Sequence, residues 1–334
     1  MISKGSKMYM EELSKFWYEV LRPIPKPEWS TPNKVVKGSL QSKLRQFSSL
    51  DKETTLIVPP QAGHHSNICD FGPNNSLVKT VISNSSDNVY ALEWKSATYA
   101  RRNETIETFI QDMDNHINHI NNPVRLIGLC QGGWQSAIYA SLYPDKVSSL
   151  VLAAAPIDFH AGNSKIQQYV TVLPLSYYEF LVNLGNGIMK GSSILQGFKS
   201  LNFFDRYFND YLKLYNNIND DEYVKRYRRF RDWYEWTQDL PGKFYLEIVD
   251  KLFKKNLLIQ DKLIINDRKV KLSNISCPLF LIAGQKDDIT LEEQLFNIER
   301  YVKSKKIKKL TVPAGHIGVF MGNKILKQFW PSIL

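Results

Sequence analysis

An apolar run ends abruptly in a glycine-rich turn in the first half of the chain. Residues 124–129 read Val-Arg-Leu-Ile-Gly-Leu, and Cys130-Gln131-Gly132-Gly133 follows directly. The residues after the turn, 134–142, are typical of a helix. A short apolar run bounded by turn residues predicts a buried strand, and small residues let the next helix pack closely behind the turn. This segment therefore predicts a strand, a sharp turn and a helix.

Strands and helices alternate on both sides of this turn. The strands that we expect are 54–58, 88–94, 124–129, 149–155, 278–283 and 308–312, and the further helices are 106–120, 291–302 and 324–333. Such alternation predicts a mostly parallel sheet with helices on both of its faces, which is an α/β architecture.

The alternation is interrupted between residues 157 and 262, which are rich in aromatic and charged residues and are predicted to be helical. We therefore expect three parts: an N-terminal leader segment at 1–50, an α/β core at 51–156 and 263–334, and a helical cap inserted at 157–262. The cap should cover the carboxyl ends of the strands, where open α/β sheets bind ligands.

Composition narrows the class of protein. The chain has 334 residues, of which 43% are hydrophobic and 23% are charged, as in ordinary soluble proteins. Its net charge is +10, but the basic residues do not form a recognisable nucleic-acid module, so we expect no nucleic-acid partner.

The apolar stretch 169–189 is interrupted by Pro174 and Glu179, so we expect no transmembrane segment. Three widely spaced cysteines predict neither disulfides nor a metal site, and we expect a cytoplasmic protein without a cofactor.

The turn at residues 128–132 has the pattern G-x-C-x-G. This is the nucleophile-elbow pattern G-x-S-x-G with cysteine at the position of serine, and its place between a strand and a helix fits that interpretation. A helix N-terminus stabilises a thiolate and a developing oxyanion. We therefore predict that Cys130 is a catalytic nucleophile in an α/β-hydrolase fold. The alternative is a structural cysteine in a glycine-rich turn.

A nucleophile of this kind needs a carboxylate and a histidine, in that order along the chain. Downstream of the expected cap the sequence has one histidine, His316, which follows the last strand. Asp287 and Asp288 follow the preceding strand, and either could orient the imidazole. We favour Asp287 as the acid and keep Asp288 as the alternative.

Two backbone N–H groups should bind the oxyanion. One is expected from Gln131, the residue after the nucleophile. The other should come from the loop after the first expected strand, where prolines 59 and 60 have no N–H, which leaves Gln61 or Ala62.

These motifs resemble the superfamily of polyhydroxyalkanoate synthases and intracellular polyhydroxybutyrate depolymerases, over roughly residues 56–334. The segments around Cys130 and at 143–147 and 156–159 look like the two-subunit synthases. The segments at 287–289 and 315–322 look more like the depolymerases. Both branches use cysteine, aspartate and histidine, and this resemblance implies the same roles for Cys130, Asp287 and His316.

The resemblance implies a cysteine-dependent acyl hydrolase or acyltransferase that acts on polyhydroxyalkanoate esters or 3-hydroxyacyl thioesters. We expect hydrolysis, and the alternatives are polymer synthesis, a small-molecule thioesterase or esterase, and a non-catalytic protein that binds a storage-granule or membrane surface. The expected partners are a hydroxyacyl ester, thioester or polyester and a granule surface in the cytoplasm, and a homodimer is compatible with the sequence.

Overall fold

The computed structural model describes residues 4–50, 53–85, 88–201 and 209–334. Within these ranges, one eight-stranded sheet has the order β1-β2-β6-β3-β7-β8-β13-β14. Pairing is antiparallel from β1 to β6 and parallel from β6 to β14. The strands are β1 (Lys34–Gly38), β2 (Ser42–Gln46), β3 (Thr54–Val58), β6 (Asn88–Trp94), β7 (Val124–Leu129), β8 (Val147–Ala153), β13 (Leu279–Gly284) and β14 (Ile307–Val312). The predicted mostly parallel sheet is confirmed.

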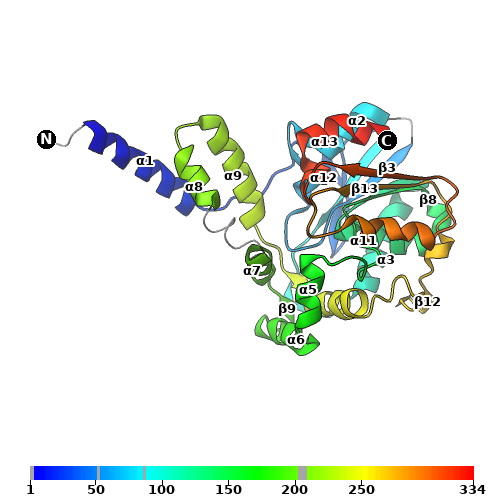
Figure 1. Ribbon diagram of the computed structural model, residues 1–334. Helices are drawn as coiled ribbons and strands as arrows, with labels where there is room; N and C mark the ends of the chain where they lie inside the picture. The colour runs from blue at the N-terminus through cyan, green and yellow to red at the C-terminus, as the bar shows by residue number, and fades with distance from the viewer. Residues whose placement is uncertain (1–3, 51–52, 86–87, 202–208) are drawn as a thin grey trace.

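Helices cover both faces of this sheet, as the alternation predicted (Figure 1). Successive residues of a strand point to opposite faces. Leu56 and Val58 pack with α3 (Ile106–Ile120) and α4 (Gln131–Leu142), whereas Ile57 packs with the opposite layer. That layer contains α2 (Leu77–Ser85), α12 (Gly318–Met321) and α13 (Asn323–Gln328). α11 (Glu292–Phe296) follows β13.

α3 illustrates how the sequence sets a helix. Thr105 caps its first turn with a capping box, and Asn121 ends it in the left-handed conformation at φ 60°. The apolar face predicted for this helix is buried in the core: Ile106, Phe109, Ile110, Met113 and Ile117.

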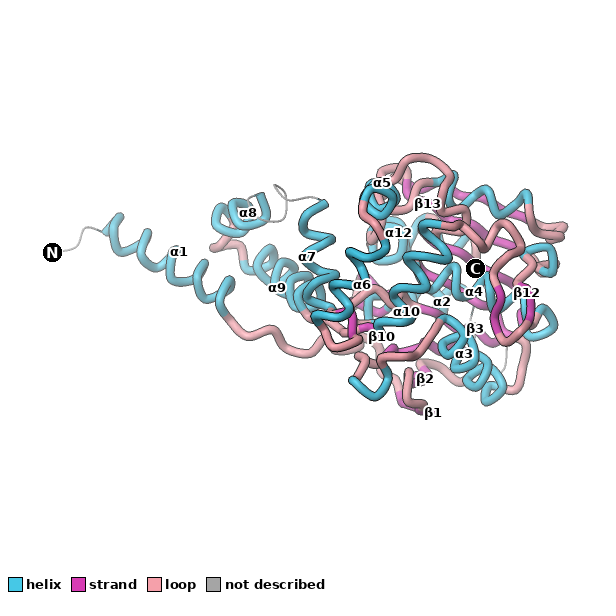
Figure 2. Tube along the Cα trace, turned by 90° about the horizontal axis from the view of Figure 1, so that it is seen from below, coloured by secondary structure: helices cyan, strands magenta, loops and turns pink. Residues whose placement is uncertain are grey.

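The sheet begins earlier in the sequence than we expected. Residues 34–46, which we assigned to the leader, form β1 and β2 at the edge of the main sheet. Their short and mainly polar sequences carry no clear alternation, and they are ordered by pairing with β6. The helical part of the leader is α1 (Lys4–Leu21), which extends away from the sheet beside α8 (Asp210–Asn216) and α9 (Asp221–Glu235) in Figures 1 and 2.

The expected cap lies between β8 and β13 along the chain. Its described part is mainly helical, and residues 202–208 lie outside the described residues. Besides α8 and α9 it contains α5 (Lys165–Val172), α6 (Leu175–Leu184), α7 (Gly191–Leu201), α10 (Gly242–Glu247) and a π-helix (Ile248–Lys254). A short two-stranded sheet of β9 (Ile188–Met189) and β10 (Leu240–Pro241), absent from our prediction, ties the first half of this segment to the second.

Candidate active site

Cys130 occupies the turn between β7 and α4. Its backbone has φ 50° and ψ −117°, a conformation that is rare for a residue with a side chain and is found at functional sites. The N–H of Cys130 donates to the carbonyl of Ala153 on β8 at 2.9 Å. Position 132, two residues after Cys130, requires glycine, because a Cβ added to Gly132 would lie 2.0 Å from the carbonyl oxygen of Val58. Close packing of α4 behind β3 and β7 therefore holds the thiol at the end of the sheet.

His316 and Asp287 meet at the same edge of the sheet. Asp287 follows β13 and His316 follows β14, and these two strands are adjacent and parallel. His316 Nδ1 lies 2.8 Å from Oδ2 of Asp287. The other carboxylate oxygen of Asp287 accepts hydrogen bonds from the backbone N–H groups of Ile289 and Thr290, both at 2.9 Å. These bonds fix the carboxylate so that it can orient the imidazole.

Asp288 lies elsewhere. Its carboxylate forms an ion pair with Lys165 of α5 at 2.6 Å, and both side chains are about half exposed. The neighbouring aspartates are thus separated: Asp287 is buried against His316 and Asp288 faces the cap.

His316 has a pKa well above its ordinary value. Burial of the ring acts in the opposite direction and lowers the pKa, but the charge of Asp287, the interaction with Cys130 and hydrogen bonds to both side chains outweigh it. The imidazolium form is therefore stabilised beside the sulfur of Cys130.

The candidate oxyanion residues lie on both sides of the thiol. Gln131 is the first residue of α4 and lines the pocket that contains Cys130. Gln61 follows β3, which pairs with β7, and its buried side chain accepts a hydrogen bond from Gln135 of α4 at 3.2 Å. Ala62 lines the pocket as well. The structure thus brings both expected segments to the pocket of Cys130.

The pocket around Cys130 is small and mainly apolar, with a volume of about 130 Å³. Cys130 and His316 line it together with residues from the core, the cap and the C-terminal helices: Pro60, Ala62, His64, Ile68, Gln131, Pro156, Ile166, Phe198, Trp233, Tyr234, Phe253, Ile289, Thr290, Gln294, Ile317 and Phe320. The rings of Trp233 and Tyr234 stack on His64, with centroid distances of 4.9 and 5.3 Å. Burial lowers the pKa of His64 to about 4, so its ring is neutral.

Phe198, Phe253 and Phe320 are pocket residues that the sequence did not single out. Aromatic residues at helical spacing are ordinary core residues, so their pattern carries no signal for a pocket. Only the packing of the cap against the core distinguishes them.

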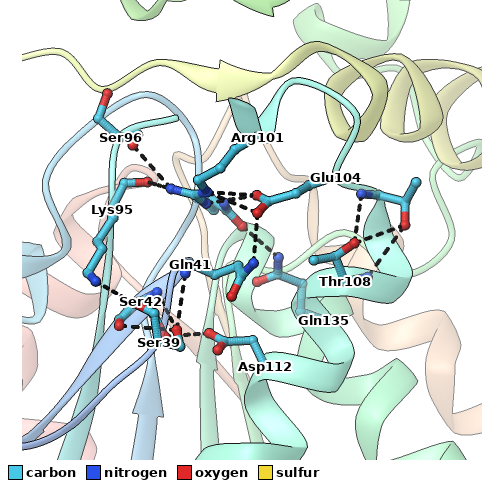
Figure 3. A network of polar contacts seen from close by, with 12 residues as sticks. Ser39, Gln41, Ser42, Lys95, Ser96, Arg101, Glu104, Thr108, Asp112 and Gln135 are labelled. Carbon is cyan, nitrogen blue, oxygen red and sulfur yellow. Dashed lines mark hydrogen bonds and ion pairs between the residues drawn. The ribbon is translucent and has the colours of Figure 1, made fainter. Parts of the chain in front are cut away.

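A second group of histidine, aspartate and serine is structural in its arrangement. Ser42 Oγ of β2 contacts both Asp112 and Nε2 of His116, the latter at 2.8 Å. Asp112 and His116 lie on α3, and all three side chains are buried away from the pocket of Cys130. Figure 3 shows the surrounding polar network, in which Glu104, just before α3, accepts from Gln41, just before β2, and from Arg101. Ser42 thus joins β2 to α3, and Glu104 joins the segments that precede these two elements.

The described residues contain no group of three or more His, Cys, Asp and Glu side chains arranged to hold a metal ion. Within the same ranges, no helix has the length and apolar composition needed to span a membrane.

Several known proteins are similar to this chain in sequence, and others are similar to it in fold. The poly(3-hydroxyalkanoate) polymerase subunit PhaC of Haloferax mediterranei is 22% identical over 312 residues, which cover 91% of this chain and 63% of the relative. The subunit of the same name from Thiocystis violacea is 24% identical over 288 residues, covering 84% of this chain and 80% of the relative. This chain therefore spans less than two thirds of the haloarchaeal protein.

Solved structures show the same fold. A thermophilic esterase from Thermogutta terrifontis superposes with a TM-score of 0.50 at 14% identity, covering 91% of this chain and 98% of that one. An epoxide hydrolase from Bacillus megaterium superposes with a TM-score of 0.50 at 16% identity, covering 84% and 92%. The chain has the α/β-hydrolase fold, and its sequence resembles those of the polyhydroxyalkanoate synthases. Residues 36–328 match the model described as "Protein of unknown function (DUF3141)", and the chain belongs to this family.

Proposed function

We propose that this protein catalyses acyl transfer from hydroxyalkanoate esters or thioesters through an acyl-thioester on Cys130. One observation carries the proposal: Cys130, in a strained turn, shares a pocket with His316, which is held 2.8 Å from the buried carboxylate of Asp287. The relatives are poly(3-hydroxyalkanoate) polymerase subunits, and they supply the proposed class of substrate, a hydroxyalkanoate.

In the first half of the reaction His316 accepts the proton of the Cys130 thiol. The thiolate attacks the substrate carbonyl carbon, and the oxyanion binds to the N–H of Gln131 and to an N–H from Gln61 or Ala62. Collapse of this intermediate breaks the bond to the leaving alcohol or thiol, which takes the proton from His316. Asp287 holds the ring in the required tautomer and stabilises the imidazolium.

In the second half an acceptor hydroxyl group attacks the acyl-thioester, and His316 accepts its proton. Water as the acceptor gives a free hydroxy acid, whereas the hydroxyl end of a polyester chain gives a longer chain and no soluble acid. Both outcomes regenerate the thiol of Cys130. We favour water, because the segments that carry Asp287 and His316 look like those of depolymerases. The names of the relatives favour synthesis, which is the second candidate.

The deciding experiment supplies the purified protein with a 3-hydroxybutyryl thioester and, separately, with amorphous polyhydroxybutyrate. Thiol release with soluble 3-hydroxybutyrate is expected for hydrolysis, and thiol release with insoluble product for synthesis. Cys130→Ala should abolish both, while Cys277→Ala, a change at a cysteine outside the pocket, should retain them. Turnover by Cys130→Ala at the wild-type rate would rule out the proposed nucleophile.

The proposed substrate also implies where in the cell the protein acts. A water-insoluble polyester is met at a granule surface, so we propose that the protein acts there, inside the cell. Sedimentation with isolated polyhydroxybutyrate granules, compared with polystyrene beads of equal area, tests this location.

A further inference from the structure

A second cavity lies in the cap, next to the pocket around Cys130. It has a volume of about 410 Å³, within the range of pockets that bind organic ligands, whereas the pocket around Cys130 is smaller than that range. Five residues line both cavities: Ala62, Gln131, Ile166, Phe198 and Phe253. We call this second cavity the cap chamber. Because the two cavities share these walls, they lie next to each other, and a molecule bound at the thiol is placed to extend toward the chamber.

Helices of the cap enclose the chamber. Its walls come from α5, α6, α7, β9, β10 and the helical segment from α10 through the π-helix, which gather on one side of the sheet in Figure 1. Tyr169 and Tyr177, on the wall of the chamber, are 49% and 40% exposed, so the chamber reaches the protein surface. A chain longer than the chamber could therefore pass out of it.

The lining combines phenol groups with aliphatic side chains. Four tyrosines line the chamber, Tyr169, Tyr177, Tyr178 and Tyr245, together with aliphatic side chains such as those of Leu181 and Ile248. No charged side chain lines it among the residues that the structure describes. Phosphate or carboxylate groups would be desolvated there without a counter-charge, so the chamber does not suit an ionic carrier group.

Tyr178 contributes its ring to the wall of the chamber. The residue is 5% exposed, and its hydroxyl oxygen is itself buried without a hydrogen-bond partner in the described part of the chain, so this hydroxyl does not open to the cavity. Tyr169 and Tyr177 are partly exposed on the same wall, and their phenol groups are the donors that a ligand in the chamber can meet.

A polyester matches this lining better than a fatty acyl chain does. Each repeating unit brings one carbonyl acceptor and a short hydrocarbon segment, which correspond to the phenols and to the aliphatic residues. A fatty acyl chain brings no acceptor beyond its reacting carbonyl. We propose that the cap chamber binds the second repeating unit of an oligomeric hydroxyacyl ester, with the phenol of Tyr169 or Tyr177 donating to its ester carbonyl. This inference rests on the proposed function of Cys130, which would hold the first unit.

The chain offers a variant that fills the chamber without a clash. Gly197 of α7 lines the chamber, and a Cβ added there has no heavy atom within 4 Å. Gly197→Phe should therefore occupy the space of the second unit. Gly38→Phe is its matched control, because a Cβ at Gly38 also meets nothing within 4 Å and this residue lies on the edge strand β1.

The experiment compares three p-nitrophenyl esters, of 3-hydroxybutyrate, of its linear trimer and of octanoate, as kcat/KM. The wild type should prefer the trimer to the monomer by about tenfold and show no such preference for octanoate. Gly197→Phe should remove the preference for the trimer and retain the monomer rate, while Gly38→Phe retains both. Equal rates of the wild type on trimer and monomer, or an unchanged preference in Gly197→Phe, would overturn the proposal.

Tyr169→Phe combined with Tyr177→Phe separates ligand binding from a structural role. The double change should lower kcat/KM for the trimer about fivefold, retain the monomer rate and leave thermal stability unchanged, since both side chains are partly exposed. Tyr99→Phe, at a residue 63% exposed and outside the chamber, is the control. An unchanged trimer preference in the double variant would contradict the role of the two phenols.

A measurement of binding tests the chamber without depending on turnover. If the wild type cleaves none of the esters, the proposed function fails, and calorimetry with the unactivated linear trimer then tests the chamber alone. Cys130→Ala should bind the trimer, and adding Gly197→Phe should weaken that binding about tenfold. Equal affinity of these two variants for the trimer would overturn the proposed binding in the chamber. Acyl transfer at Cys130 would still be tested separately by the turnover assay.

Discussion

Asp288 forms an ion pair with Lys165 at 2.6 Å and therefore faces away from His316, although Asp287 beside it contacts that histidine. Two adjacent carboxylates that the sequence presents as near equivalents thus have different surroundings. One is buried and accepts three hydrogen bonds, two from backbone N–H groups and one from the imidazole. The other is half exposed.

This separation predicts unequal effects of the same substitution. Asp287→Asn should lower kcat by roughly 10⁴-fold, because the amide leaves His316 in the wrong tautomer. Asp288→Asn should change kcat by less than about fivefold, since an exposed ion pair contributes at most about 1 kcal/mol. Steady-state kinetics on a 3-hydroxybutyrate ester measures both, and a larger loss in Asp288→Asn would mean that the acid is misassigned.

The three thiols should differ in their rates of alkylation. Burial raises the pKa of Cys277 to about 11, which leaves roughly one thiolate in 3,000 near pH 7.5. Burial first, and the charge of Asp70 second, also raise the pKa of Cys69 well above its ordinary value. Cys130 adjoins His316 and the N-terminus of α4, which favour a reactive thiol.

Brief treatment with iodoacetamide followed by peptide mass spectrometry should therefore show Cys130 labelled at least about tenfold faster than the other two. The advantage should disappear in His316→Gln. Similar labelling of all three cysteines in the wild type would argue against an activated thiol.

His316 also predicts how stability depends on pH. Its pKa is raised in the folded state, so protonation stabilises the fold; this contribution is complete below the unfolded pKa near 6.5 and is lost as pH rises through the folded pKa. The wild type should therefore lose free energy of unfolding, relative to His316→Gln, between about pH 6.5 and more alkaline pH. Urea titrations of both proteins across this range test the sign. A difference that grows with pH would contradict the raised pKa.

Two glycines predict opposite effects of the same added methyl group. Gly132→Ala would place Cβ 2.0 Å from the carbonyl oxygen of Val58, so α4 must shift and stability should fall by about 2–4 kcal/mol. Gly197→Ala adds a Cβ in open space within helix α7 and should raise stability by about 0.5–1 kcal/mol. Chemical denaturation measures both, and equal destabilisation would mean that the turn is looser than the structure describes.

The sequence by itself determined the elements whose signal is local. The apolar runs at Thr54–Val58, Asn88–Trp94 and Val124–Leu129 are strands with the predicted bounds, and Ile106–Ile120 is the predicted helix. These segments are set by residue type and period, which neighbours in space do not alter. The order of Cys130, Asp287 and His316 along the chain was equally readable, and their catalytic roles remain predictions.

Tertiary structure decided what depends on neighbours distant in the sequence. The polar strands β1 and β2 became part of the sheet only through pairing with β6. Asp287 and Asp288 are identical in type and adjacent, so only the positions of β14 and α5 distinguish them. The four tyrosines of the cap chamber are spread from residue 169 to residue 245, and they face one cavity only because the cap helices pack together over the core. Packing between distant segments has no local pattern, and for that reason the sequence could not reveal it.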